Sequence, residues 1–207
     1  NPSGNLFLAN NLSLLSSVSI ADVESYSAPT GITIYTLGVV TVKNTNVSSI
    51  NGGGAGMYIE QLGGATGAIN ISGGSFSNNP GSSGISIFGL GNVTLTNVSA
   101  NYNGKHGIQV DTSGSAVART FSATGSTFQG NTWNGLQVDV LGQITVTNSK
   151  AFYNGVRGFD LDNDGPNGIG GITVTATGSN YTVVYGNTSD GIQAYSNRNI
   201  LINRVDS

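Results

Sequence analysis

The sequence predicts an all-β protein, a single parallel β-helix of about eight coils. One observation is an internal repeat: Gly84 to Asn103 (GISIFGLGNVTLTNVSANYN) returns 51 residues later as Gly135 to Asn154 (GLQVDVLGQITVTNSKAFYN). The other is that apolar and polar residues alternate within each unit with the period of a β-strand, and no segment has helical apolar spacing. Short strands repeated every 23 to 33 residues are typical of a solenoid.

Each coil begins at a glycine that precedes an apolar–polar–apolar triplet. This glycine occurs at Gly31, Gly56, Gly84, Gly107, Gly135, Gly158 and Gly191. The spacings are 25, 28, 23, 28, 23 and 33 residues, so long and short coils alternate. We therefore expect one domain over residues 1–207, with a degenerate first coil at 1–30, regular coils in long and short pairs at 31–190, and an incomplete last coil at 191–207.

Three strands are expected in each coil. The first follows the coil glycine, the second lies in segments such as residues 40–42 and 144–146, and a shorter third includes Phe76 and residues 98–100. Strands that recur in the same order stack into three parallel sheets, with equivalent apolar side chains lying above one another inside the coil.

A recurrent asparagine closes the third segment, four or five residues before the next coil glycine. It occurs at Asn51, Asn79, Asn103, Asn131, Asn154 and Asn187. A side-chain amide both donates and accepts hydrogen bonds, so equivalent asparagines can bond to the same turn of the next coil. We expect a structural asparagine ladder.

These phrases also carry a family resemblance. Asn-x-x-x-Gly-Ile-x-Val (from Asn103) and Val-Thr-Leu-Thr-Asn (from Val93) resemble repeats of the right-handed, pectate-lyase-like superfamily of parallel β-helices. The resemblance covers Gly31 to the C-terminus well and residues 1–30 weakly. It implies a right-handed coil, but it matches no specific enzyme family. That superfamily includes lyases, hydrolases, epimerases, tailspikes, adhesins and structural rods, so the resemblance implies no single activity.

Composition excludes several classes of protein. The net charge of −3 gives no general attraction to nucleic acid, and no apolar run approaches a membrane span. The chain has no cysteine, which excludes disulfides and thiolate metal sites. A Lys-poor composition rich in Ser, Thr, Asn and Gly is similar to that of bacterial surface and secreted proteins, so we expect an extracellular or cell-surface location.

The outward positions of the predicted first strands are rich in acids. Asp111, Asp139 and Tyr195 are equivalent residues on this face and are candidate ligand-binding residues. In the 33-residue coil, Asp160-Leu-Asp162-Asn-Asp164-Gly165 resembles a calcium loop, in which alternating carboxylates converge on a cation. Asp160, Asp162 and Asp164 are therefore candidate metal ligands, with calcium as the possible cofactor. The alternative is a solvated acidic strand that runs into a polar turn.

An enzymatic function would use the same acid-rich face of the predicted first strands. Asp139, Asp160 and Asp162 could supply a carboxylate pair for a glycoside hydrolase, and Arg157 is the nearest base for a polysaccharide lyase. Local catalytic motifs of pectate lyases and polygalacturonases are absent. His106 is the single histidine, and we expect it at the surface of a turn. We assign no catalytic residue.

Two functions follow. The first is a non-catalytic extracellular structural β-helix that stacks end to end with itself into a filament or forms part of an adhesin stalk. The alternative is a β-helix that binds or cleaves a polysaccharide through its Asp-rich first-strand face.

Overall fold

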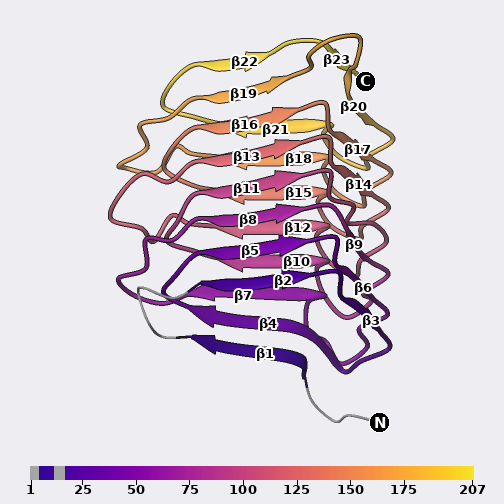
Figure 1. Ribbon diagram of the computed structural model, residues 1–207. Helices are drawn as coiled ribbons and strands as arrows, with labels where there is room; N and C mark the ends of the chain where they lie inside the picture. The colour runs from indigo at the N-terminus through magenta and orange to yellow at the C-terminus, as the bar shows by residue number, and fades with distance from the viewer. Residues whose placement is uncertain (1–4, 12–16) are drawn as a thin grey trace.

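The strands wind round one axis into a stack of coils. The computed structural model describes residues 5–11 and 17–207, and every regular element in this part is a β-strand. Figure 1 shows the coils rising from the N-terminal end to the C-terminal end. Of the degenerate first coil expected at 1–30, residues 1–4 and 12–16 lie outside the described residues. The described residues contain no helix long and apolar enough to cross a membrane.

Two sheets run the whole length of the described stack, and all their strands pair in parallel. The first sheet contains β1 (Asn5–Asn11), β4 (Thr30–Thr36), β7 (Met57–Gln61), β10 (Ile85–Phe88), β12 (Ile108–Asp111), β15 (Leu136–Asp139), β18 (Phe159–Asp162) and β21 (Ile192–Tyr195). The second contains β2 (Val18–Ala21), β5 (Val40–Lys43), β8 (Ile69–Ser72), β11 (Val93–Thr96), β13 (Phe121–Thr124), β16 (Ile144–Thr147), β19 (Ile172–Thr175) and β22 (Ile200–Ile202). Eight strands leave seven intervals, so the chain makes about seven complete turns between β1 and β21 where the sequence predicts about eight coils.

The third sheet is interrupted. Its first part is β3 (Glu24–Tyr26), β6 (Asn46–Ser48) and β9 (Ser75–Ser77), and its second part is β14 (Thr127–Gln129), β17 (Lys150–Phe152), β20 (Thr182–Tyr185) and β23 (Val205–Asp206). Ser99 lies between them and forms isolated bridges to Ser75 and Thr127. The predicted parallel β-helix is therefore confirmed, with the third sheet narrowed to one residue at this coil.

The core is a set of apolar columns inside the coil. The register places Ile87 beside Val110, and Val110 beside Val138, and each of these side chains is buried. Phe128 and Phe159 are also buried, and their rings pack edge to face with 6.2 Å between centroids. Burying each such side chain contributes roughly 1.5–3 kcal/mol, so the alternating pattern of the sequence supplies the main stabilising term.

Hydrogen-bonded asparagines line one corner of every coil from Asn79 onward. The Nδ2 groups of Asn79, Asn103, Asn131 and Asn154 donate to the Oδ1 of the next asparagine at 2.9–3.0 Å, and the series ends at Asn187. This agrees with the predicted ladder. The expectation for Asn51 is wrong, because Ile50 donates its backbone N–H to Asn79 Oδ1 and occupies the equivalent place. Ile50 is buried, whereas Asn51 is exposed.

Two further corners require left-handed backbone. One contains Asn97, Gly125 and Asn148 with φ between 51° and 64°, and the other contains Tyr102, Gly130 and Tyr153 with φ between 56° and 63°. Glycine adopts this conformation without a Cβ clash. In both corners glycine occurs in the coil that starts at Gly107, and a larger residue occurs in the short coils on either side.

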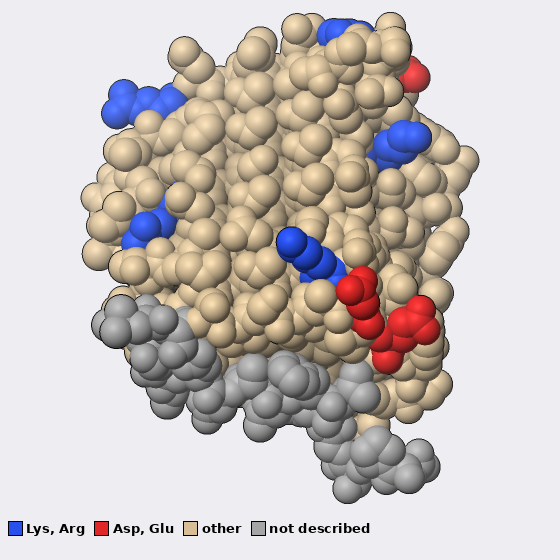
Figure 2. Space-filling model, viewed as in Figure 1, with Lys and Arg blue, Asp and Glu red and all other residues tan. Residues whose placement is uncertain are grey.

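The outer face of the second sheet is polar but has few charges. Thr94, Thr145 and Thr173 are half-buried on this face. Figure 2 shows this side of the molecule, where basic groups are widely spaced and the few visible acidic groups lie mainly near one lower edge. The acid-rich face predicted from the sequence belongs to the first sheet.

Candidate functional site

The first-strand face is the outer surface of the first sheet. Its register aligns one column of side chains consisting of Tyr35, Glu60, Phe88, Asp111, Asp139, Asp162 and Tyr195. Because strands in a sheet lie about 4.8 Å apart, successive members of the column are direct neighbours. The sequence-predicted candidates Asp111, Asp139 and Tyr195 therefore share one column, with Asp162 between Asp139 and Tyr195.

The N-terminal end of this face is aromatic. Tyr58 packs edge to face on Tyr35 at 6.1 Å and lies 5.7 Å from Phe88 between ring centroids. The Tyr58 hydroxyl donates a hydrogen bond of 2.9 Å to Glu60 Oε2. Burial, followed by this interaction with Glu60, raises the pKa of Tyr58 to about 12. Tyr35 and Tyr58, with Thr30 and Thr33, also line a shallow surface cavity of about 240 Å³.

The middle of the face is acidic. Asp111, Asp139 and Asp162 lie in register on β12, β15 and β18. Burial raises the pKa of Asp139 to about 6, and the charges of Asp111, Asp162 and Asp164 act in the same direction. Burial also raises the pKa of Asp162. Burial and repulsion between neighbouring carboxylates both disfavour the ionised form of Asp139. Asp139 therefore remains protonated into the mildly acidic range.

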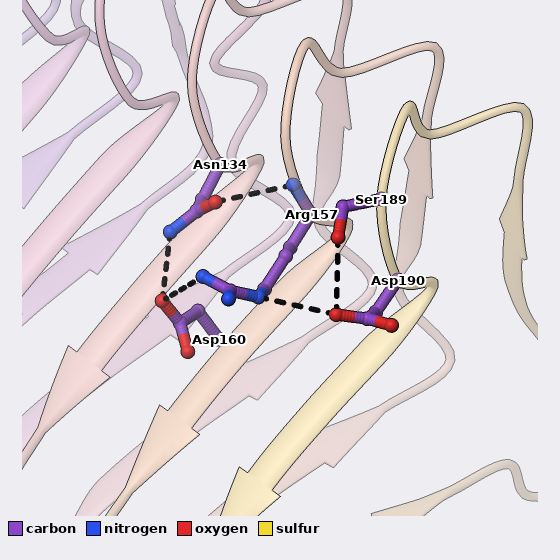
Figure 3. A network of polar contacts seen from close by, with 5 residues as sticks. All are labelled: Asn134, Arg157, Asp160, Ser189 and Asp190. Carbon is purple, nitrogen blue, oxygen red and sulfur yellow. Dashed lines mark hydrogen bonds and ion pairs between the residues drawn. The ribbon is translucent and has the colours of Figure 1, made fainter.

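Asp160 belongs to a different set of contacts, which Figure 3 shows at the start of the first strands. Its Oδ2 accepts a hydrogen bond of 2.9 Å from Asn134 Nδ2 and forms an ion pair of 3.3 Å with Arg157. Arg157 also pairs with Asp190 at 3.4 Å, and Ser189 donates to the same carboxylate. The single guanidinium therefore balances two carboxylates from neighbouring coils, and Asp160 is directed towards it.

The three candidate calcium ligands do not converge. Asp162 Oδ1 accepts the backbone N–H of Asp164 at 3.0 Å, which is a strand running into a polar turn. Between them Asn163 is buried and donates to the carbonyl groups of Gly142 and Gly171. Among the described residues no group of three His, Cys, Asp or Glu side chains could hold a metal ion. Calcium binding by this segment remains a prediction from the sequence pattern.

His106 is not at the surface, contrary to the expectation from its turn sequence. It is buried, and its ring meets Trp133 edge to face at 5.0 Å. Burial, followed by the charge of Lys105, lowers the pKa of His106 to about 4. The imidazole is therefore neutral near pH 7, and it serves the packing of this corner beneath the exposed Trp133 ring.

A column of exposed tyrosines was missed at the sequence level. Tyr102 and Tyr153 are each more than half exposed and occupy the same left-handed corner in two short coils. The signal was present, because each tyrosine directly precedes a ladder asparagine in the repeated phrase Ala-x-Tyr-Asn-Gly. Alternation of apolar and polar residues within strands says nothing about corner residues, so it predicts no role for these tyrosines.

Comparison with known families decides the classification. Residues 6–189 match the family described as "Right handed beta helix region". The chain belongs to this right-handed β-helix family. No curated protein and no solved structure matches the chain. Family membership establishes the right-handed β-helical fold but does not by itself identify an activity, which depends on the surface residues.

Proposed function

We propose that this β-helix is a non-catalytic structural protein of the cell exterior, a rod that is a subunit of a filament or a segment of an adhesin stalk. The observation that carries the proposal is the continuity of its coil-to-coil bonding. From Asn103 to Asn187 each ladder asparagine accepts both a side-chain and a backbone hydrogen bond from the asparagine of the preceding coil, in addition to the pairing of the sheets. Such stacking resists separation of the coils and suits a stiff spacer.

The proposed partner is a second copy of the chain, stacked end to end. In β22, Ile200 and Ile202 continue the core columns above Ile172 and Val174, yet both are exposed. The outer edge of β22 also has no paired strand among the described residues. An incoming strand would cover both isoleucines and pair with this edge, since a free strand edge is a template for further pairing.

Self-association tests this proposal. Purified protein is examined by negative-stain microscopy and sedimentation, together with the double variant Ile200→Glu, Ile202→Glu. Leu201→Glu is the matched control, because Leu201 lies on the same strand but on the outward face beside Thr173. We expect rods longer than one chain for the wild type and Leu201→Glu, and monomers for the double variant. A wild type that stays monomeric at every concentration would overturn end-to-end stacking.

A second candidate function is polysaccharide binding or cleavage at the first-strand face. The specific observation in its favour is that aromatic rings and carboxylates share one column, a combination that can stack on sugars and bond their hydroxyl groups. Asp160→Asn with Asp162→Asn tests it, by binding to and cleavage of acidic polysaccharides. Loss of binding or of lyase or hydrolase activity, with unchanged folding, would replace the structural proposal.

A further inference from the structure

Tyr102 and Tyr153 occupy equivalent corners two coils apart. The backbone N–H of Tyr102 donates to Gln129, that of Gly130 donates to Phe152, and that of Tyr153 donates to Tyr185. These bonds place Tyr102, Gly130 and Tyr153 in successive coils. Two coil rises correspond to a separation of about 9.6 Å along the axis.

The rings of Tyr102 and Tyr153 also make the same contact with the coil that follows. A Cβ added to Gly130 would lie 2.6 Å from both Cδ1 and Cε1 of Tyr102. A Cβ added to Gly186 would lie 2.5 and 2.6 Å from the same two atoms of Tyr153. The Cδ1–Cε1 edge of each ring therefore packs against the glycine of the next coil. Over half of each side chain remains exposed, at 53% for Tyr102 and 58% for Tyr153.

The Tyr153 ring packs edge to face against two neighbouring rings. Phe152 and Tyr185 are neighbours in adjacent coils, and their rings stack in parallel with 5.2 Å between centroids and 3° between planes. Tyr153 is at 83° to Phe152 and 80° to Tyr185. The Tyr153 ring therefore stands across both of these planes, and its Cδ1–Cε1 edge reaches Gly186 of the next coil, as the same edge of Tyr102 reaches Gly130.

Neutral amide side chains border the aromatic column. Asn101 and Gln129 directly precede Tyr102 and Gly130 in the chain, and both are half-buried. Asn101 Oδ1 accepts the backbone N–H of Gln129 at 2.8 Å, which holds these two residues together in adjacent coils. Aromatic faces beside uncharged donors and acceptors match a ligand with alternating C–H faces and hydroxyl groups.

We propose that the tyrosine column, Tyr102 and Tyr153, is a binding site for an extended polysaccharide that runs parallel to the rod axis. In an extended β-1,4-linked chain, sugar rings two apart present the same face, and their separation matches two coil rises. One sugar ring stacks on each tyrosine, and the intervening sugar bridges the two stacked rings. This site lies at a corner of the coil, and its occupation is independent of both the end-to-end stacking and the first-strand face.

A proline-rich peptide is the competing ligand. A polyproline II helix advances about 9.3 Å per turn, which is close to the tyrosine spacing, and aromatic surfaces bind such peptides. The amides of Asn101 and Gln129 favour the hydroxyl-rich ligand. Binding of a proline-rich peptide without binding of the sugar would overturn the proposal.

The test measures binding of cellohexaose, chitohexaose and mannohexaose by calorimetry and NMR. Tyr102→Ala and Tyr153→Ala should each weaken binding of the preferred hexasaccharide roughly tenfold, whereas Tyr153→Phe should retain it. Tyr26→Ala is the matched control, because Tyr26 is an exposed tyrosine on the third sheet in an early coil. Thermal unfolding of each variant verifies folding.

Three results would overturn the proposal: no binding of any of the three hexasaccharides at millimolar concentration, equal binding by the tyrosine variants, or equal loss in Tyr26→Ala. The variant Asp160→Asn, Asp162→Asn separates this site from the first-strand face. It should bind the hexasaccharide normally; if it alone loses binding, the sugar binds the first-strand face and the tyrosine column is not the site.

Discussion

Asn131 donates two hydrogen bonds to one atom of Asn154. Its backbone N–H lies 3.1 Å and its Nδ2 lies 3.0 Å from Asn154 Oδ1. The second Nδ2 hydrogen is directed to the Ala100 carbonyl at 3.0 Å, and Asn131 is buried. One side chain thus ties together three coils, and its oxygen in turn accepts the equivalent pair of bonds from Asn103.

Replacing Asn131 by Ala should be strongly destabilising. The change leaves the backbone N–H and one Nδ2 hydrogen of Asn103 without an acceptor in a buried corner, because the other Nδ2 hydrogen still donates to the Phe76 carbonyl. Each unsatisfied group costs about 1–3 kcal/mol. We expect a loss of about 3 kcal/mol in the free energy of unfolding, measured by denaturant titration. Asn180→Ala, at an exposed asparagine, should change stability by less than about 0.5 kcal/mol. Equal effects for both variants would show that the ladder contributes no specific stability.

Gly130→Ala should destabilise the protein through two causes that can be separated. The residue has φ of +63°, and its new Cβ would lie 2.6 Å from the Tyr102 ring. Left-handed backbone alone costs an alanine about 1–2 kcal/mol. Tyr102→Ala removes the ring, so the double variant should recover the remaining part of the loss. A double-mutant cycle measures this coupling, and strict additivity would contradict the contact between Tyr102 and Gly130.

Asp139→Asn should stabilise the protein at neutral pH and leave it unchanged in acid. The pKa of Asp139 is raised from 3.8 to about 6 in the folded state, so the folded chain holds this proton more tightly than the unfolded chain. The stability from that proton is present below pH 3.8 and is lost as the pH rises through 6. Because the side chain is partly solvated, we expect a gain for Asn of about 1 kcal/mol at neutral pH.

Denaturant titrations at several pH values measure this difference. Asp206→Asn, at an exposed acid near the C-terminal end, is the control; because it retains Asp139, its stability should fall with rising pH as that of the wild type does. A wild type that becomes more stable than Asp139→Asn as the pH rises from 4 to 7 would contradict the burial of Asp139 among like charges.

Calcium should leave the unfolding midpoint of the wild type unchanged relative to an ionic-strength control. Asp160 is held by Arg157 and Asn134, and Asp162 accepts the N–H of Asp164, so these carboxylates are not free to converge. Thermal unfolding with calcium chloride, sodium chloride or EDTA measures the effect. A saturable stabilisation by calcium that Asp162→Asn abolishes would support the calcium loop predicted from the sequence. Arg157→Ala, which releases Asp160, is the informative companion variant.

The coil architecture could be read from the sequence because it depends on local periodicity. Alternation over four residues decides which side chains of a segment such as residues 144–147 point inward, and the coil spacing decides which residues lie above them. The ladder asparagines followed for the same reason, since equal phase in successive coils means direct contact. Asn51 was misassigned because the coil that contains it is one residue out of phase, which placed Ile50 at the ladder position.

The surface was decided by the tertiary structure. Asp160 and Asp162 alternate like calcium ligands in the sequence, yet Arg157 and the turn at Asp164 direct their carboxylates apart. Arg157 and Asp190 each directly precede a coil glycine, so the coil spacing places them in adjacent coils, but the ion pairs of Arg157 with Asp190 and Asp160 depend on side-chain geometry that the pattern does not give. The sequence by itself determined the coils and their buried columns, since periodic burial leaves few alternatives. Corner geometry alone decided that Arg157 pairs with two acids and that the rings of Tyr102 and Tyr153 remain exposed.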